Sequence, residues 1–428
     1  MKMNRRTMIK IVGGVVAAKT ITSCGQVANA KSGPKSGSSQ FGRAGGNRVV
    51  VCGGGWGGVS VARSVKEANP QAEVFLIEKN QVFSSCPMSN LYLSGMMPFY
   101  FSDYTVLSQK GINVIQSVIN GIDSGNRKVF GSFGEIEYDY LVLSPGIDYM
   151  YESVQGLKEA KNHIPIAWKP AAEHLFLKKE LENFEGGTMV IGIPKGPIRC
   201  PPGPYERVAM MAYHLKKNNI KGKILVFDAN EKPMSKGKGF LAAYKDLYGD
   251  IVEYHSSHEV EAVDHNKKVV SHSFGDTKYD MANIIPQMKA GELVRMAGVG
   301  DRWVNVKGTD FRTEANDRVY VVGDAIGNQG FPKSGFMANS VGVACGQQIA
   351  RRMAGKPLTV PKLANTCFST VDGAGEVGQA IKVSHVFKLD QKTDKWSKKG
   401  KANVNRSEDM AYAGREWAEE IWYSMLGG

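Results

Sequence analysis

The feature that most constrains the fold is a strand that runs into a glycine-rich turn near the start of the chain. Residues 47–58 read NRVVVCGGGWGG, and a predicted helix follows over residues 59–68. Gly53, Gly55 and Gly58 have the G-x-G-x-x-G spacing, which permits a tight turn, a close approach of backbone to pyrophosphate and close packing of the helix. The sequence therefore predicts a dinucleotide-binding βαβ unit.

An acidic residue at the end of the next predicted strand supports a bound dinucleotide. That strand covers residues 73–78 (EVFLIE), and Glu78 follows Gly58 by twenty residues. A carboxylate at this position accepts hydrogen bonds from the hydroxyls of the adenosine ribose. We therefore expect Glu78 to bind the ribose, and Cys52 in the first strand to be a small buried residue.

Two later segments indicate that the nucleotide is FAD. Residues 138–146 (YDYLVLSPG) and 318–324 (RVYVVGD) resemble the second and third sequence signatures of the two-dinucleotide-domain flavoproteins, which have the glutathione-reductase-like fold. This resemblance implies that Asp324 binds the ribityl or pyrophosphate part of the flavin.

A predicted helix follows the third signature. Residues 333–335 (KSG) open it, and it continues as an apolar helix to about Arg351. The positive end of the helix dipole would point at the pyrimidine end of the flavin and favour the anionic reduced form. The positive charge of Lys333 would strengthen this effect. Cys345, in the middle of this helix, is expected in the core.

A second α/β unit lies where a flavin reductase of this kind carries its NAD(P)H domain. Its turn, residues 194–207 (PKGPIRCPPGPYER), lies between a predicted strand and a predicted helix but holds prolines and no glycine fingerprint. A proline turn offers few free N–H groups to a pyrophosphate. We therefore expect a reductant other than a nicotinamide nucleotide, and a turn that delivers Cys200 and Glu206 to a redox centre built elsewhere in the chain.

The fold class predicted is α/β, with two Rossmann-type dinucleotide-binding-like domains and a small C-terminal α+β domain, which suits a length of 428 residues. The predicted divisions are a signal segment (1–30), a flexible linker (31–46), the first part of the FAD-binding domain (47–160), a second Rossmann-like domain without an NAD fingerprint (161–299), the second part of the FAD-binding domain (300–365) and a C-terminal interface domain (366–428).

The last predicted helix, residues 409–426, has Trp417, Ile421, Trp422 and Met425 near one face. This pattern resembles the amphipathic helices that lie on membrane surfaces. Because glutamates occupy its polar face, we expect the helix to dock on the body of the protein.

The N-terminus predicts export to the periplasm. Residues 4–10 (NRRTMIK) match a twin-arginine signal, and Ala28-Asn29-Ala30 forms an A-x-A cleavage site. Residues 21–24 (ITSC) also resemble a lipoprotein cleavage box, so cleavage after Ala30 and a lipid anchor at Cys24 are both open. No run of eighteen apolar residues follows the first thirty positions, so no transmembrane helix is expected, and no motif resembles a nucleic-acid-binding one.

The six cysteines contain no C-x-x-C pair, which argues against a c-type haem site and a thioredoxin-like motif. Any haem is therefore expected on another chain, and no metal site is predicted. Cys200 and Cys367 each lie in a predicted polar turn. In an oxidising compartment they form either a disulfide or two unrelated thiols.

Four segments together resemble the flavoprotein subunit of flavocytochrome c sulfide dehydrogenase, within the glutathione-reductase-like superfamily that also contains sulfide:quinone oxidoreductase. The segments are 83–90 (FSSCPMSN), 200–207 (CPPGPYER), 332–335 (PKSG) and 365–367 (NTC). The resemblance implies a redox-active disulfide between Cys200 and Cys367 beside the flavin, and covalent attachment of FAD through Cys86. Residues 83–85 offer no tyrosine before Cys86, and residues 389–407 are polar and basic, which departs from the family pattern.

The same resemblance implies an activity. Hydrosulfide would attack the disulfide and leave a persulfide on one cysteine and a thiolate on the other, and electrons would pass through FAD to a c-type cytochrome subunit in a heterodimer. Glu206 would shuttle protons if burial raises its pKa, and otherwise it is a surface or salt-bridged glutamate.

Three other functions share parts of this pattern. A sulfide:quinone oxidoreductase uses the same cysteine chemistry but reduces membrane quinone. A coenzyme A disulfide reductase would use Cys86 as a lone nucleophile but needs NAD(P)H. A non-enzymatic flavoprotein would assist a sulfur-oxidising complex by binding or repair.

Overall fold

The computed structural model describes residues 41–169 and 171–427, and all of these fall in one of the two units of the chain, Ser38–Gly428. The predicted twin-arginine segment, the A-x-A site, Cys24 and the linker up to residue 40 lie outside the described residues. Export and lipidation therefore stay predictions.

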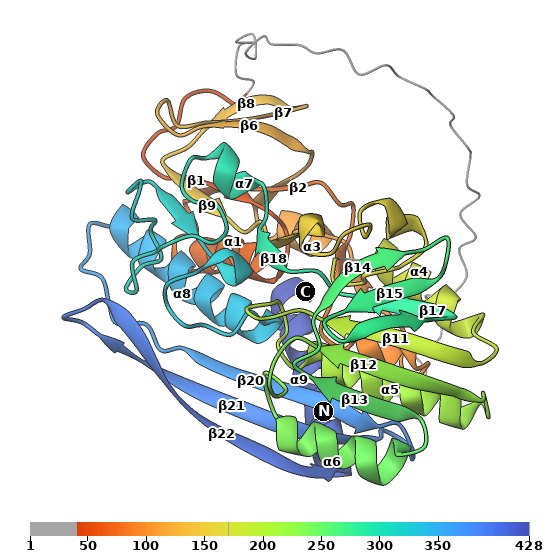
Figure 1. The fold of residues 1–428 in the computed structure, drawn as a ribbon. Helices are drawn as coiled ribbons and strands as arrows, with labels where there is room; N and C mark the ends of the chain where they lie inside the picture. The colour runs from red at the N-terminus through yellow and green to blue at the C-terminus, as the bar shows by residue number, and fades with distance from the viewer. Residues whose placement is uncertain (1–40, 170, 428) are drawn as a thin grey trace. The chain divides into compact units, whose positions relative to one another are not determined.

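A five-stranded parallel sheet carries the glycine-rich turn (Figure 1). Its strand order is β19-β9-β1-β2-β5, with bounds Val319–Val321, Tyr140–Leu143, Arg48–Cys52, Glu73–Glu78 and Ile112–Gln116. Every residue of β1 is buried, as the short apolar strands of covered parallel sheets usually are. Cys52 and Cys345 are fully buried, which confirms that both belong to the core.

Two long helices pack on each other beside this sheet. They are α1 (Trp56–Ala68), which follows the glycine turn, and α8 (Gly335–Met353). Ser64 Oγ on α1 donates to the carbonyl of Val343 at 2.8 Å, and Asn339 Nδ2 on α8 donates to Ser60 Oγ at 2.8 Å. This packing places the start of α8 beside the glycine turn.

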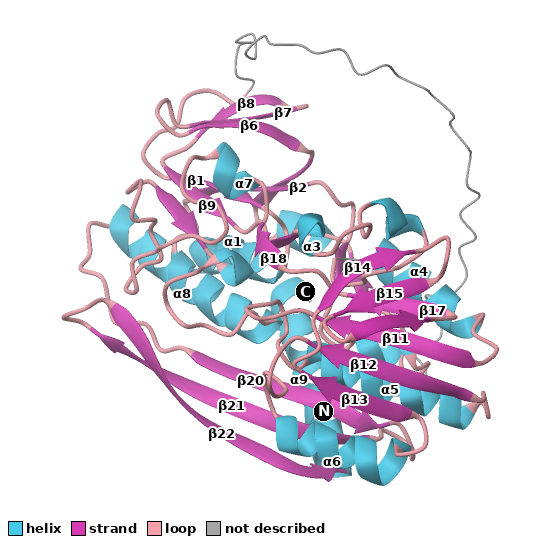
Figure 2. Cartoon of the chain, in the orientation of Figure 1, coloured by secondary structure: helices cyan, strands magenta, loops and turns pink. Residues whose placement is uncertain are grey.

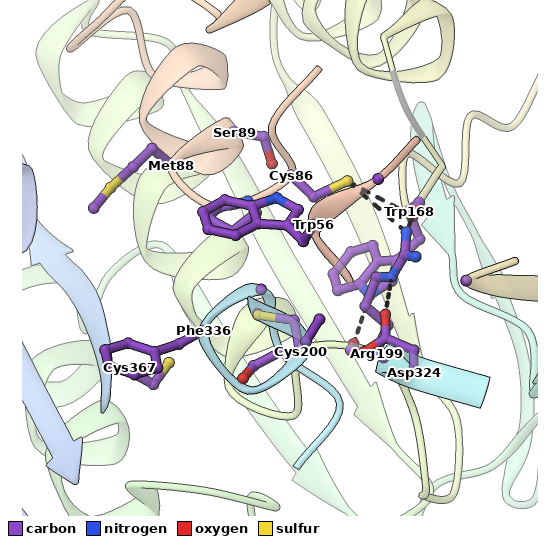
Figure 3. A pocket seen from close by; sticks show the side chains of 18 of the residues that line it. Trp56, Cys86, Met88, Ser89, Trp168, Arg199, Cys200, Asp324, Phe336 and Cys367 are labelled. Atoms are coloured by element: carbon purple, nitrogen blue, oxygen red, sulfur yellow. Dashed lines mark hydrogen bonds and ion pairs between the residues drawn. The ribbon is translucent and has the colours of Figure 1, made fainter. Parts of the chain in front are cut away.

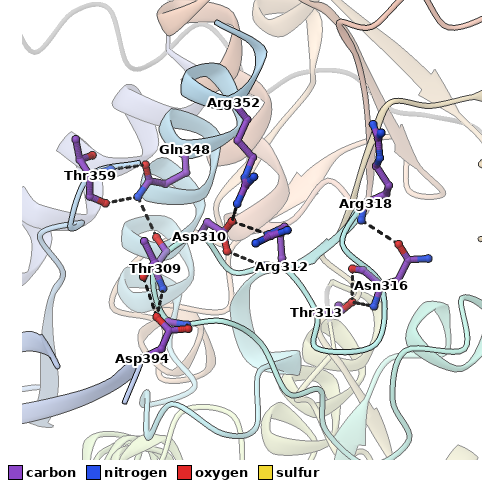
Figure 4. Close-up of polar contacts among 11 residues, drawn as sticks. Thr309, Asp310, Arg312, Thr313, Asn316, Arg318, Gln348, Arg352, Thr359 and Asp394 are labelled. Atoms are coloured by element: carbon purple, nitrogen blue, oxygen red, sulfur yellow. Dashed lines mark hydrogen bonds and ion pairs between the residues drawn. The ribbon is translucent and has the colours of Figure 1, made fainter. Parts of the chain in front are cut away.

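Polar contacts fix the far end of α8 (Figure 4). Asp310 is buried and accepts from Arg312 Nε at 2.7 Å and from Arg352 Nη2 at 2.5 Å. Asp394, in the turn after β21, accepts from the N–H of Thr309 at 2.9 Å and from its hydroxyl at 2.8 Å. The loop around Asp310 is thus tied both to α8 and to the C-terminal sheet.

A second parallel sheet has the order β13-β12-β11-β17, with bounds Val252–Ser256, Gly222–Asp228, Gly187–Ile193 and Met281–Ile284. Helices α4 (Ala172–Glu182), α5 (Gly203–Lys217) and α6 (Gly237–Tyr248) belong to this part of the chain. The turn from β11 to α5 carries Cys200, and α5 begins at Gly203, within residues 194–207 that the sequence assigns to the turn.

The C-terminal part is a three-stranded antiparallel sheet and a helix (Figure 2). They are β20 (Ala364–Asp372), β21 (Gln379–Asp390), β22 (Lys395–Ser407) and α9 (Glu408–Leu426). Ile421, Trp422 and Met425 on α9 are buried, which confirms that this face docks on the protein itself. No helix among the described residues is long and apolar enough to cross a membrane.

Smaller elements complete the fold. They are β3 (Phe83–Ser84) paired with β4 (Phe101–Ser102); β6 (Ile119–Asp123), β7 (Lys128–Gly131) and β8 (Gly134–Glu137); β10 (Ile147–Tyr149) paired with β18 (Met288–Ala290); β14 (Val260–Asp264), β15 (Val269–His272) and β16 (Gly275–Lys278); and α2 (Ser89–Leu93), α3 (Thr105–Gln109) and α7 (Leu293–Met296). The predicted α/β class with parallel, Rossmann-like sheets is confirmed.

Candidate active site

One cavity brings together segments from all three parts of the fold (Figure 3). The glycine turn, the segment before α2, the turn before α5, the start of α8, strand β20 and helix α9 all line it. Of the predicted site residues, the cavity is lined by Gly55, Cys86, Cys200, Glu206, Asp324 and Cys367. Residues far apart in the sequence thus meet at one place.

The glycine turn below this cavity leaves no room for side chains at two positions. Gly53 has a φ of +107°, and a Cβ there would lie 2.3 Å from the carbonyl oxygen of Ser144. A Cβ on Gly58 would lie 1.8 Å from the carbonyl oxygen of Gly53. Gly53 and Gly58 thus pack against backbone, whereas Gly55 lines the cavity. The first turn of α1 can therefore approach a ligand closely.

Glu78 lies beside the turn as predicted from the sequence. Its Oε2 accepts from the N–H of Gly54 at 2.7 Å, and its Oε1 accepts from the N–H of Asn80 at 2.8 Å. These contacts orient the carboxylate at the edge of the dinucleotide turn. Its contact with a ribose stays a prediction.

Unpartnered polar atoms indicate that the cavity fits a ligand with hydrogen-bonding groups. Asp324 Oδ1, Trp56 Nε1 and Trp417 Nε1 are buried and have no hydrogen-bond partner, and all three residues line the cavity. Buried polar atoms usually have hydrogen-bond partners. Three buried atoms without partners in one cavity therefore favour a bound ligand that supplies the partners. Together with the glycine turn, these atoms fit a flavin dinucleotide.

Lys333 is directed elsewhere than expected. Its Nζ donates to the carbonyl oxygens of Asp324 at 2.6 Å and Ile326 at 2.9 Å, and it lies 3.5 Å from the centre of the Trp303 ring. Burial lowers the pKa of Lys333 to about 8, partly opposed by Asp324. Because two carbonyls and an aromatic face already hold the ammonium, the side chain braces the Asp324 loop and does not line the cavity.

Cys200 occupies a constrained turn. Its φ of +54° is in the left-handed region, which costs a non-glycine residue about 1 kcal/mol. Its N–H donates to the carbonyl of Lys333 at 2.6 Å, and its carbonyl accepts from the N–H of Gly203 at 2.7 Å. The turn is therefore anchored to the segment before α8, and this anchor holds Cys200 at the cavity.

Cys367 lies in the middle of β20 and not in a turn, which corrects the expectation from its polar neighbours. Its partner across the ladder is Val383 on β21. The long antiparallel pairing outweighs the local turn preference of the asparagine two residues earlier, because strand propensity depends strongly on context.

Both cysteines are free thiols in the structure, and the disulfide expected between Cys200 and Cys367 stays a prediction. The two residues line the same cavity. Burial raises the pKa of Cys200 well above its ordinary value, and the charges of Cys367 and Glu206 raise it further while Lys236 opposes them.

Among residues 41–169 and 171–427, Glu206 is neither a surface glutamate nor part of a salt bridge to a lysine or arginine. Its Oε2 accepts from Asn90 Nδ2 at 2.7 Å, and its Oε1 accepts from the N–H of Thr370 at 2.8 Å. Burial raises the pKa of Glu206, and these two hydrogen bonds oppose the rise. A carboxyl group with a raised pKa beside a thiol is suited to accept and donate protons.

Cys86 points toward Arg199 in the same cavity (Figure 3). Its Sγ lies 4.0 Å from Arg199 Nη1, and Arg199 Nε forms an ion pair with Asp324 Oδ2 at 2.6 Å. Burial raises the pKa of the Cys86 thiol, and Arg199 opposes the rise. Cys86 thus has a different charged neighbour from the Cys200 and Cys367 pair.

The sequence patterns did not predict a place at or near the cavity for several residues, among them Asn90, Arg199, Lys236 and Trp417. Trp417 was assigned to the docking face of the last helix, but its ring stacks with Trp56 at 6.1 Å and Phe336 at 5.7 Å between centroids. In the sequence, the only sign that Arg199 belongs to the site is its position immediately before Cys200. No motif marked Lys236.

Comparisons with known proteins connect this geometry to sulfur chemistry. A family model described as the central part of the sulfide dehydrogenase [flavocytochrome c] flavoprotein chain matches residues 174–286. A second, described as pyridine nucleotide-disulphide oxidoreductase, matches residues 47–192.

Individual relatives are similar over longer stretches. The sulfide-quinone reductase of Aquifex aeolicus is 26% identical over 358 residues, which cover 75% of this chain and 80% of the relative. The mitochondrial sulfide:quinone oxidoreductase of Mus musculus is 23% identical, and the match covers 64% of this chain and 65% of the mouse protein. A sulfide dehydrogenase [flavocytochrome c] flavoprotein chain of Chlorobaculum thiosulfatiphilum is 46% identical over 43 residues, which are 10% of this chain and 90% of that sequence.

A solved structure shares the fold. The sulfide:quinone oxidoreductase of Aquifex aeolicus has a TM-score of 0.71 and 22% identity, and the match covers 89% of this chain and 92% of that one.

The raised pKa of Glu206 predicts a pH effect on stability. In the pH window between the ordinary glutamate value of about 4.3 and the raised value, the folded state binds more protons than the unfolded state. The free energy of unfolding attributable to this group therefore falls as pH rises through that window. We expect Glu206→Gln to remove this slope.

Urea unfolding from about pH 5 to about pH 8 measures the effect, with Glu416→Gln on the exposed side of α9 as the matched control. The free energy of unfolding of the unsubstituted protein should fall with pH relative to Glu206→Gln. Equal pH slopes for all three proteins would rule out a raised pKa at Glu206.

Proposed function

Because the chain belongs to the family of flavoproteins that includes the sulfide:quinone oxidoreductases and the flavocytochrome c sulfide dehydrogenase flavoprotein chains, we propose that it oxidises sulfide to sulfur or polysulfide through Cys200 and Cys367. One observation carries this proposal: two cysteines 167 positions apart in the sequence line a single cavity beside a dinucleotide turn. The second sheet carries a cysteine turn where a nicotinamide-binding loop would lie.

FAD is the proposed cofactor. Gly53, Gly55 and Gly58 would form the turn under its pyrophosphate, while Glu78 and Asp324 would hold its ribose and ribityl hydroxyls. When bound, FAD takes up electrons in pairs from thiols and releases them singly to a one-electron acceptor. The protein itself provides cysteine sulfurs, charged side chains and a proton acceptor around the proposed flavin site.

The cysteine pair would begin the reaction as a disulfide. Hydrosulfide attacks one sulfur, so that a new sulfur–sulfur bond forms, the Cys200–Cys367 bond breaks, and the electron pair stays on the departing cysteine. The anchored left-handed turn at Cys200 holds one sulfur at a fixed place in the cavity. Glu206, held by Asn90 and Thr370, would take up the proton that the persulfide loses.

The proposed electron acceptor is a c-type cytochrome subunit that pairs with this chain. The match of residues 174–286 to the flavocytochrome c family and the C-P-P-G-P-Y-E-R run at residues 200–207 support it. The apolar face of α9, which would otherwise suit a membrane surface, is buried against the protein. The alternative acceptor is quinone, because the relatives that match over longer stretches are named sulfide-quinone reductase and sulfide:quinone oxidoreductase.

Export by the twin-arginine route would bring the protein to the periplasm, where such cytochromes are found. This proposal rests on residues 4–10 and on the cleavage site that ends at Ala30, with a lipid anchor at Cys24 as the alternative. A non-enzymatic role in a sulfur-oxidising complex is the remaining alternative. Sulfide-dependent turnover separates that role from catalysis.

Replacing Cys200 tests the proposed reaction. We expect Cys200→Ser to lower the rate of sulfide-dependent flavin bleaching by at least about a hundredfold, because serine cannot form the disulfide that hydrosulfide attacks. Anaerobic stopped-flow absorbance measures the rate. Cys345→Ala, which alters a buried thiol on α8 outside the cavity, is the control and should bleach normally. Full bleaching of Cys200→Ser would refute the proposal.

The same preparations distinguish the acceptors. We expect sulfide-reduced protein to reduce added cytochrome c faster than a soluble quinone, and faster quinone reduction would favour the alternative.

Cys86 is proposed to hold FAD covalently, as its place beside Arg199 at the cavity allows. We expect acid precipitation of the unsubstituted protein to leave the yellow colour in the pellet. For Cys86→Ser the colour should move to the supernatant, because serine offers no thiolate for a thioether bond. Flavin that dissociates from the unsubstituted protein in acid would contradict covalent attachment without affecting the proposed reaction.

A further inference from the structure

A buried ammonium group lies next to one of the two cysteines. Lys236 caps the N-terminus of α6 with a φ of +54°, and its side chain is buried. Its Nζ lies 3.6 Å from Cys367 Sγ, and it donates to the carbonyl oxygen of Cys367 at 3.0 Å and to Ser369 Oγ at 2.8 Å. Two fixed acceptors on β20 thus aim the cation at one sulfur.

This cation forms no ion pair with a carboxylate in residues 41–169 and 171–427. Glu206 is the acidic group on which the charge of Lys236 acts, but no ion pair joins the two among the described residues, and both oxygens of Glu206 accept from Asn90 and Thr370. A buried charge is costly unless an opposite charge lies beside it. A thiolate on Cys367 would supply that charge.

The backbone around Cys200 offers few N–H donors to an anion. Helix N-termini usually stabilise a nearby thiolate through their free N–H groups. Here Pro201, Pro202 and Pro204 have no N–H, and the N–H of Gly203 donates to the carbonyl of Cys200 itself. The backbone at the start of α5 therefore leaves few donors for the Cys200 sulfur.

Other charged groups around Cys367 do not replace Lys236. The titratable or charged groups around the two cysteines include Lys236 before α6, Cys200 before α5, Glu206 and Arg207 on α5, and His385 and Lys382 on β21. Lys382 Nζ lies over the ring of Phe368, 5.5 Å from its centre. The cavity-lining residues that α8 and α9 contribute are uncharged: Gly335, Phe336, Ala338 and Trp417.

We propose that Lys236 makes Cys367 the departing thiolate and Cys200 the sulfur that receives sulfide, an assignment that rests on the proposed function. Hydrosulfide forms a bond to Cys200 Sγ, the bond from Cys200 Sγ to Cys367 Sγ breaks, and its electron pair remains on Cys367 beside the ammonium. The sulfide sulfur is oxidised to the persulfide level and Cys367 is reduced. The proton of hydrosulfide starts on the terminal sulfur of the Cys200 persulfide, within the cavity that Glu206 lines.

Lys236→Met tests the role of the cation in the full, flavin-loaded protein. After anaerobic reduction with dithiothreitol and its removal, iodoacetamide alkylation of each cysteine is followed by peptide mass spectrometry across a pH series. We expect Lys236→Met to slow alkylation of Cys367 about tenfold near neutral pH, because an opposite charge at this range favours the thiolate. Alkylation of Cys200 should change less.

Lys236→Arg is the matched control, because it keeps the positive charge and should retain most of the Cys367 reactivity. Flavin content and circular dichroism report whether each variant folds. If Lys236→Met does not fold, Ser369→Ala is used instead, because it removes the hydroxyl that holds Lys236 Nζ. It should slow alkylation of Cys367 by a smaller factor. An unchanged Cys367 profile in a folded variant would overturn the role of Lys236.

Mapping the added sulfur tests the assignment itself. Oxidised protein is mixed with one equivalent of sulfide and trapped with iodoacetamide, and the extra sulfur should be found on the Cys200 peptide. Extra sulfur on the Cys367 peptide would overturn the assignment. If sulfide adds to neither cysteine, the proposed function fails, while the alkylation comparison still decides whether Lys236 stabilises the Cys367 thiolate.

Discussion

The hydrogen bond from the Cys200 N–H to the Lys333 carbonyl, 2.6 Å long, connects the two halves of the redox site. Cys200 follows the first strand of the second sheet, whereas Lys333 precedes α8, which packs on the glycine-turn helix. The Lys333 ammonium is held in turn by the carbonyls of Asp324 and Ile326. Because the whole segment is braced, the strained turn at Cys200 stays at the cavity.

The charges around the cavity divide its three cysteines between two tasks. Arg199 lies beside Cys86 and is paired with Asp324, so this side combines a thiol with residues suited to hold a cofactor. Lys236 lies beside Cys367 and has no carboxylate partner among the described residues, so its charge is available to a sulfur that acquires electrons. Under the proposed function, the cavity would bind a flavin at one thiol and exchange sulfur at the other two.

Local patterns predicted much of the fold. The glycine turn, its strand and Glu78 could be predicted because each depends on spacing within a few turns of the chain. Cys367 was placed in a turn from its polar neighbours, but its pairing with Val383 on β21 keeps it in a strand. Local propensity gives way where a long ladder supplies its own partners.

The contacts between distant segments could not be predicted in this way. Lys236 lies 131 residues before Cys367 and belongs to no motif, so only the docking of α6 against β20 reveals their contact. Trp417 has the spacing of a docking residue, and its stacking with Trp56 depends on how α9 meets α1. Cys86, Cys200 and Cys367 were grouped from a family resemblance, and spacing alone left their relation open.

The central claim is that a cysteine turn has taken the place of a nicotinamide loop, so that electrons enter from sulfide. The most direct measurement mixes the anaerobic, oxidised flavoprotein with one equivalent of sulfide and, separately, with one equivalent of NADH, and follows the flavin absorbance. After mixing with sulfide, the absorbance of the oxidised flavin should be lost. After mixing with NADH, it should stay unchanged. Rapid bleaching by NADH, or none by sulfide, would contradict the claim.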